Sequence, residues 1–227
     1  MSKLIIVPTP IGNLGDVSHR TVEALKSCDV ILCEDTRVCS KLLKFVGITK
    51  KLITYRDDNE QKQTSLILSL IKDGYSVCLT TDAGTPCISD PGYRIVNACR
   101  KNNITIEVLP GPCAAITALS ASGMPTNGFL FVGFLPNKSS ARRNFFEKYK
   151  NFEYSIIFYE SCHRIQKFIE DAYLVLGRNR TICVAKEITK LHESFITGEL
   201  SEVLEKIKQT PQKGEFVIII APQSFQF

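Results

Sequence analysis

Short apolar segments alternate with amphipathic ones through the first half of the chain, and this alternation limits the possible folds more than any other feature. Continuous apolar runs such as residues 3–7 and 29–33 are typical of strands buried on both faces. Residues 64–72 instead place their apolar side chains on one stripe, as a helix packed on a sheet does. The alternation predicts an α/β fold with a parallel sheet, right-handed crossovers and helices on both faces.

These signals give an order of elements for the first half. Strands are predicted at residues 3–7, 29–33, 51–55, 75–80 and 105–109. Helices are predicted at residues 21–26, 40–45, 64–72, 93–101 and 113–122. Because ligands of such sheets bind outside the carboxyl ends of the strands, the loops that follow the strands are the expected place for chemistry.

A run of small residues, Pro and Gly at residues 122–128 interrupts the pattern and is typical of a domain junction. Beyond it, strands are predicted at residues 129–134, 154–159, 181–185 and 216–220, with helices at 165–176 and 201–209. We therefore predict two α/β domains, residues 1–122 and 123–227, the second with a mixed sheet.

The composition excludes several classes of protein. The chain has 227 residues, 44% hydrophobic and 22% charged, which is typical of a globular protein. No apolar run reaches the roughly 18–20 residues of a membrane span, and the N-terminus lacks a signal-peptide layout, so a cytoplasmic location is expected. Nine cysteines without a CxxC pair, and only three histidines, favour free thiols over disulfides or zinc. The net charge of +5 permits a nucleic-acid partner without requiring one.

Common nucleotide-binding and hydrolase motifs are absent. No GxGxxG follows a predicted strand, and residues 133–139 end like a P-loop but lack a Gly before Lys138. No GxSxG elbow occurs either. A dehydrogenase, an NTPase and a serine hydrolase are therefore disfavoured.

Three loops at the carboxyl ends of predicted parallel strands remain: residues 8–16, 81–92 and 110–115. All are rich in Gly, Pro and small residues, so their backbone can approach a ligand closely. The third opens a helix, whose N-terminus favours an anionic group. Any one of them alone could be a tight turn between strand and helix. Three at one sheet edge favour a site for a small molecule.

Seven segments resemble the signatures of a known family: PTPIGNLGD, CEDTR, TDAGTPCISDPGYR, LPGPCAAITALSASG, GFLP, FYESCHR and AKEITKLHE. They are similar to those of the bacterial ribosomal RNA small-subunit methyltransferase I family, in the tetrapyrrole-methylase-like superfamily. The resemblance implies a homodimer of chains with two α/β domains and a cofactor cleft between them. It implies methylation of a cytidine ribose 2′-oxygen in 16S rRNA of the 30S subunit, with S-adenosyl-L-methionine as donor and no metal.

The resemblance also assigns cofactor contacts. Those in the three loops are Pro10, Ile11, Asp82, Ala83, Gly84, Thr85, Cys113 and Ala114. The central loop would hold the methionine end through backbone groups, while Tyr159 and Ala185 would flank the adenine. The chain departs from the family pattern where Cys87, Cys113 and Cys162 replace a usual Gly, Ser and Pro. It also ends soon after its last predicted strand, where typical members continue into a helical segment.

Ribose methylation requires the 2′-oxygen to be aligned with the sulfonium methyl and its proton to be removed. Charged residues at the ends of second-domain strands, or in the segments that follow, are the candidates for this work: Glu160, His163, Arg164, Lys186, Glu187, Lys190, His192 and Glu193. For each of them, the alternative is a structural ion pair, a cap or a solvated charge.

Other charged residues are candidates for holding the RNA. They are Asp35 and Arg37 after the second strand, Arg142 and Arg143 in the basic and aromatic segment 138–150, and Arg164. Such a segment can bind phosphates and stack on bases, or it can be an amphipathic helix with its charges in water. Two other functions stay open: a methyltransferase of the superfamily that acts on a tetrapyrrole or a protein, and a shortened, non-catalytic paralogue.

Overall fold

The computed structural model describes residues 2–209, 211 and 213–226. The chain forms two compact units, which divide between Cys113 and Ala114. The predicted boundary lay between Ser122 and Gly123. The observed division comes earlier because helix α5 (Ala114–Ala121) contacts strands β7 (Ser155–Ser161) and β10 (Glu215–Ile220) of the second unit.

The first unit is built on a five-stranded sheet in which every pairing is parallel, as the alternation predicts. Its strands are β1 (Leu4–Ile6), β2 (Val30–Cys33), β3 (Lys51–Thr54), β4 (Val77–Leu79) and β5 (Ile106–Val108). Their order in the sheet is β3-β2-β4-β1-β5. The central strands β2, β4 and β1 are buried along their whole length, because helices cover both faces.

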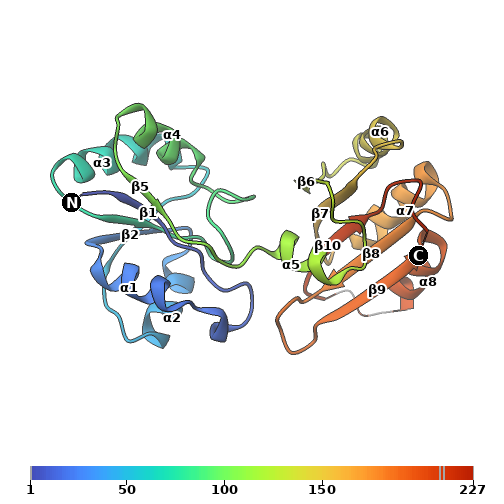
Figure 1. The fold of residues 1–227 in the computed structure, drawn as a ribbon, viewed down its shortest axis with the longest axis horizontal. Coiled ribbons are helices and arrows are strands. Elements are labelled where there is room, and N and C mark those ends of the chain that lie inside the picture. Colours follow the sequence, from blue (N-terminus) through green and yellow to red (C-terminus); the bar gives the residue numbers. More distant parts are fainter. Residues whose placement is uncertain (1, 210, 212, 227) are drawn as a thin grey trace. The chain divides into compact units, whose positions relative to one another are not determined.

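Two cores lie on the two faces of this sheet (Figure 1). The helices on one face are α1 (His19–Ser27) and α2 (Thr36–Phe45), and those on the other are α3 (Glu60–Lys72) and α4 (Tyr93–Lys101). Ile5 and Ile31 pack with α1 and α2, whereas Leu4 and Leu32 pack with α3 and α4. Successive side chains of each strand point to opposite faces, so each strand contributes residues to both cores. A short 3₁₀ helix, η1 (Leu14–Asp16), lies in the loop after β1.

Two helices begin four residues earlier than predicted, since polar residues form their first turns. Helix α2 starts at Thr36, and the side chain of Asp35 caps it by accepting a hydrogen bond from the Arg37 amide at 2.8 Å. Helix α3 starts at Glu60, whose carboxylate is buried and accepts hydrogen bonds from the amides of Gly92 and Arg94 at 3.0 Å. Prediction from the apolar stripe alone missed both turns.

The second unit contains a mixed five-stranded sheet, as predicted. Its strands are β6 (Phe129–Phe134), β7, β8 (Thr181–Lys186), β9 (Ser194–Glu199) and β10, in the order β6-β7-β10-β8-β9. Strands β6 and β7 are parallel, and the other neighbours are antiparallel. The sequence did not predict β9, because this edge strand is only partly buried and carries no apolar run.

Three helices cover one face of the second sheet: α6 (Ser139–Tyr149), α7 (Ile165–Leu176) and α8 (Leu200–Gln209). Phe146, Phe158 and Phe168 meet edge to face beneath them, with ring centroids 5.2–6.1 Å apart. All nine cysteines are free thiols, and most are buried. Within the part of the chain that the structure describes, no helix is long and apolar enough to cross a membrane.

Candidate functional site

The three loops singled out in the sequence follow β1, β4 and β5, which are neighbours in the first sheet. The backbones of Thr9 and Gly84 form an isolated antiparallel bridge, with N···O distances of 2.8 and 3.1 Å. The Thr85 hydroxyl donates a hydrogen bond to the carbonyl of Pro112 at 2.8 Å. The three loops are thus joined to one another at the carboxyl edge of the sheet.

Two glycines permit this close approach. A Cβ at Gly111 would lie 2.2 Å from Cγ of Pro8, so only a glycine fits there. Gly84 has a positive φ of 95°, and a Cβ on it would lie 3.3 Å from Ile11. Both backbone groups of Gly84 bind Thr9, so Gly84 joins the loops. Its contact with the cofactor stays a prediction.

The other predicted loop residues surround this junction. Ile11 is buried against Gly84, and Pro10 is half-buried. Ala83 is exposed next to Gly84, and Asp82 accepts a hydrogen bond from the Asp35 amide at 3.0 Å. The edge therefore presents small side chains and one carboxylate.

Two carboxyl groups that were not among the predicted site residues lie at this edge: Asp90 in the second loop and Glu34 after β2. The Thr81 hydroxyl donates to Asp90 at 2.7 Å, and burial raises the pKa of Asp90 to about 6. Burial also raises the pKa values of Glu34 and Asp82. The available signal was that both residues lie in the family motifs, Glu34 directly after the buried strand β2 and Asp90 in the loop after β4.

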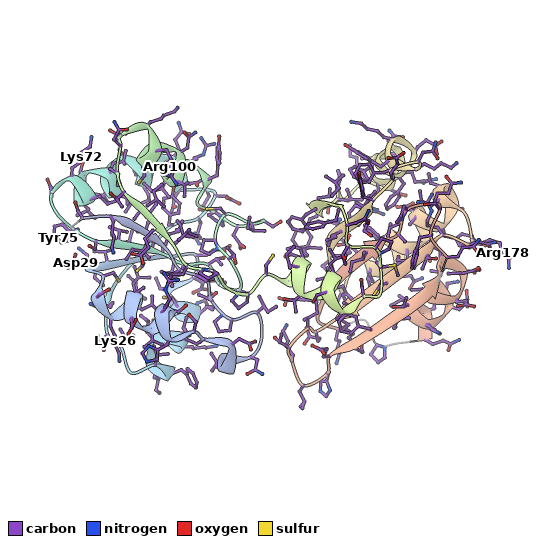
Figure 2. All side chains as sticks on the ribbon, in the orientation of Figure 1. Lys26, Asp29, Lys72, Tyr75, Arg100 and Arg178 are labelled. Carbon is purple, nitrogen blue, oxygen red and sulfur yellow. The ribbon has the colours of Figure 1, made fainter. Side chains whose placement is uncertain are left out.

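The opposite edge of the first sheet, where the strands begin, makes ordinary surface contacts. Asp29 accepts a hydrogen bond from the Ser76 amide at 2.7 Å, and Lys72 donates to the side chain of Asn102 at 3.0 Å. Figure 2 labels Asp29 and Lys72. Asp35 and Arg37 lie instead at the carboxyl edge, after β2, and pair at 2.5 Å. The hydrogen bonds from Arg37 lower the pKa of Asp35 to about 2, while the Arg37 side chain is 86% exposed.

The second loop also contains two residues other than glycine with positive φ, Cys87 at 72° and Ser89 at 64°. Cys87 is the position where the family pattern usually has Gly. Glycine adopts this conformation without steric cost, which gives a physical reason for that preference. Gly92 closes the loop at a φ of 136° and leaves room for the Cys87 sulfur.

Tyr159 and Ala185, the two residues predicted to flank the adenine, lie in one row of the second sheet. Val217 is the direct partner of both, so the three side chains share one face. The Tyr159 hydroxyl accepts a hydrogen bond from the Ala115 amide at 3.1 Å, next to Ala114. The structure thus brings Tyr159 close to Ala114, and buries Ala185 fully.

The neighbouring row contains Glu160, Phe216 and Lys186, and it points to the other face. The Glu160 side chain is completely buried and pairs with Arg164 at 3.0 Å. Lys186 donates to the carbonyl of Pro211 at 3.0 Å and lies over the Phe216 ring. Glu160 therefore points to the face that the helices cover, where Arg164 binds it. This position supports a structural role for its carboxylate and not a catalytic one.

Two arginines hold the loop between β6 and α6. Arg164 donates to the carbonyl of Leu135 at 2.6 Å and to the side chain of Asn137. Arg142 donates to the carbonyl of Asn137 at 2.7 Å and pairs with Asp171 at 2.6 Å. Arg142 is only 2% exposed, so its predicted contact with RNA is corrected to a structural role.

The remaining second-unit candidates are more accessible. The side chain of Arg143 is 48% exposed, and His163 is exposed in the turn after β7. Glu187 accepts hydrogen bonds from Lys190 and from the Glu215 amide, each at 2.9 Å. Burial acts to raise the pKa of Glu187, but these bonds lower it overall, so Glu187 is a poor proton acceptor.

No group of three or more His, Cys, Asp or Glu side chains is arranged to hold a metal ion in the described ranges of the chain. The donors near the loop junction are backbone groups, hydroxyls and isolated carboxylates. The surface is suited to an organic ligand with polar ends.

Comparisons with known proteins agree with this geometry. A family model for tetrapyrrole (corrin/porphyrin) methylases matches residues 3–204. Among solved structures, a diphthine synthase has a TM-score of 0.75 at 13% identity, over 99% of this chain and 91% of that one. The methyltransferase CobJ has a TM-score of 0.72 at 16% identity, over 100% and 97%. The fold is therefore that of a tetrapyrrole methylase, as the sequence predicted.

Proteins with similar sequences identify one family within the tetrapyrrole methylases. The ribosomal RNA small subunit methyltransferase I of Escherichia coli O157:H7 is 44% identical over 96% of this chain and 77% of its own length. The protein of that name from Hydrogenobaculum sp. (strain Y04AAS1) is 45% identical over 98% of this chain and 96% of its own. The chain belongs to the ribosomal RNA small subunit methyltransferase I family.

Proposed function

We propose that this protein methylates the ribose 2′-oxygen of a cytidine in 16S rRNA of the 30S subunit, with S-adenosyl-L-methionine as the methyl donor. One observation carries the proposal: three loops are joined at one sheet edge by the Thr9–Gly84 bridge and the Thr85–Pro112 hydrogen bond. This junction belongs to a chain whose relatives are named rRNA methyltransferases.

The residues present fit such a donor. Pro10, Asp82 and Ala83 offer a small, partly exposed surface beside the loop junction. Cys113 and Ala114, at the start of α5, would make further contacts with the donor, and Tyr159 with Ala185 would serve the adenine. When bound, the donor supplies a methyl group already activated by its sulfonium charge. The protein therefore has mainly to hold the acceptor oxygen in line with this methyl group.

Exposed charged residues and His163 are proposed to bind the RNA and its 2′-hydroxyl group. His163 is exposed after β7 and would accept the proton of the 2′-hydroxyl. Glu187 would orient the ribose instead of removing a proton. Lys186 shares the row of Glu160 and binds the Pro211 carbonyl, so no catalytic role is proposed for it. Arg37 and Arg143 would contact phosphates, because both project into solvent.

We also propose that the protein acts in the cytoplasm as a homodimer. Light scattering at micromolar concentration tests the assembly, and a monomer mass would contradict it. Arg164 is assigned to ordering the loop between β6 and α6, in place of a direct contact with RNA.

The experiment uses purified protein, labelled S-adenosyl-L-methionine and 30S subunits from a strain that lacks its own enzyme of this family. We expect label in the 16S rRNA, and none in parallel reactions with a tetrapyrrole or with ribosomal proteins. Label in either of those acceptors would favour another methyltransferase of the superfamily. Cofactor binding without any transfer would favour a non-catalytic paralogue.

A further inference from the structure

A turn between β8 and β9 projects one large apolar side chain into solvent. Leu191 is 92% exposed, more than any other large hydrophobic residue among those the structure describes. Its neighbour His192 is exposed as well. Single exposed apolar residues are normal on protein surfaces, so exposure alone does not indicate a function. The conformation of the turn is the second observation.

The turn is held in one conformation by a dense set of hydrogen bonds. The Lys190 amide donates to the Glu187 carbonyl at 3.0 Å, and the Glu193 amide donates to the Lys190 carbonyl at 3.1 Å. The Glu193 carboxylate accepts from the Thr189 amide at 2.6 Å. The Lys190 side chain bridges the carboxylates of Glu187 and Glu215 at 2.9 and 2.8 Å.

This conformation is strained. Glu187 has a φ of 51°, and Thr189, a β-branched residue, has a φ of 65°. The Thr189 hydroxyl is buried without a hydrogen-bond partner. Gly214 is needed opposite the turn, since a Cβ on it would lie 2.5 Å from the Glu187 side chain. Strain that the surrounding structure maintains is typical of segments with a function.

The turn lies at a defined edge of the second sheet. Strand β6 is parallel to β7, and β8 runs in the same direction because both β7 and β8 are antiparallel to β10. Their carboxyl ends therefore share one edge. This edge carries the exposed His163 after β7 and the exposed Lys138 after β6. Leu191 thus lies at the same edge of the sheet as His163 and Lys138. His163 is the residue proposed to accept the proton of the 2′-hydroxyl.

We propose that Leu191, with His192 beside it, packs against an unpaired base of the RNA next to the target nucleotide. The inference rests on the proposed function and adds a contact that selects the substrate. Proteins recognise unpaired nucleotides by stacking their bases on aromatic, His or Arg side chains, and a base taken out of the stack is also held between apolar side chains. A rigid turn can do so with little loss of conformational entropy on binding.

A base fits this turn better than a protein surface does. The residues next to Leu191 in the turn, Lys190, His192 and Glu193, are all polar or charged. A stable protein interface buries about 800 Å² on each partner, which one side chain cannot provide. A single base face is of the size that one Leu side chain covers.

The test compares Leu191→Ala with Leu174→Ala. Leu174 is a matched control because it is a 66% exposed leucine on α7. Binding of each fluorescently labelled protein to 30S subunits is measured, together with the KM of methyl transfer. For Leu191→Ala we expect Kd and KM to rise about tenfold, a typical loss for one base contact, with melting temperature and S-adenosyl-L-methionine affinity unchanged. Leu191→Phe retains binding, and Leu174→Ala behaves as wild type.

Equal loss in both alanine variants, or no loss in Leu191→Ala, would overturn the inference. A change of oligomeric mass in Leu191→Ala would also overturn it, in favour of a contact between two copies of the chain. If the wild type binds 30S subunits without transferring label, the proposed function fails, while the binding comparison still decides the role of Leu191.

Discussion

Cys87 holds a left-handed backbone conformation that a side chain with a Cβ adopts only at a cost. Its φ is 72°, in the loop that carries Asp82 to Thr85. We predict that Cys87→Gly is more stable than Cys87→Ala by about 1 kcal/mol, because both lose the sulfur but only glycine removes the strain. Urea unfolding of the two variants measures the difference. Equal stabilities would mean that the loop relaxes around the residue.

Asp90 is a half-buried carboxyl group whose pKa of about 6 lies well above its ordinary value of 3.8. Below about pH 4 the group is protonated in both the folded and the unfolded state, so its burial carries no charge penalty. As the pH rises through about 6, the folded state must hold a buried charge, and stability is lost.

We therefore predict that Asp90→Asn raises the free energy of unfolding near neutral pH. The expected gain is about 1–2 kcal/mol, reduced from the full linkage value because the group is partly exposed. The gain should disappear towards about pH 4. Urea unfolding at several pH values checks this, and a gain that does not depend on pH would contradict the pKa assignment.

At the scale of elements, α6 and α7 are tied to the loop between β6 and α6 by buried charges. Arg142 pairs with Asp171, and their side chains are 3% and 6% exposed. We predict that Arg142→Ala lowers stability by about 3 kcal/mol or more, since it removes one partner of a buried ion pair. The matched change Arg143→Ala should cost less than about 1 kcal/mol, because Arg143 is half-exposed. Thermal unfolding of both variants tests this difference.

Arg143 is then the arginine of α6 that tests RNA binding. Its loss should flatten the slope of log affinity for 30S subunits against log salt by about 0.7–0.9, the value for one phosphate contact. The affinity for S-adenosyl-L-methionine should not change. An unaltered slope would identify the exposed face of α6 as a solvated surface.

Sequence patterns predicted elements better than they predicted side-chain roles. Buried strands such as β2 are continuous apolar runs, so their existence and the parallel sheet could be predicted. The edge strand β9 and the polar first turns of α2 and α3 gave no such signal. The pattern of charges could not distinguish the buried Arg142 from the half-exposed Arg143. Both pair with Asp171, at 2.6 and 3.2 Å, and only tertiary packing decides which of them is buried.

At the scale of the whole molecule, the account depends on the junction of three loops. We predict that Gly84→Ala weakens S-adenosyl-L-methionine binding at least tenfold, because its Cβ would lie 3.3 Å from Ile11 and its φ is positive. Gly47→Ala is the matched control: Gly47 has a φ of 70°, and its Cβ would meet nothing within 4 Å. Calorimetric titration should show normal affinity for the control despite a comparable loss of stability.

The most direct test of the central claim is to identify the atom that receives the methyl group. Labelled 16S rRNA from the reaction with 30S subunits is digested to nucleosides and analysed by mass spectrometry. The account predicts a single labelled product, 2′-O-methylcytidine, that is absent with heat-inactivated enzyme. Label on a nucleobase, on a different nucleoside, or only on protein would contradict it.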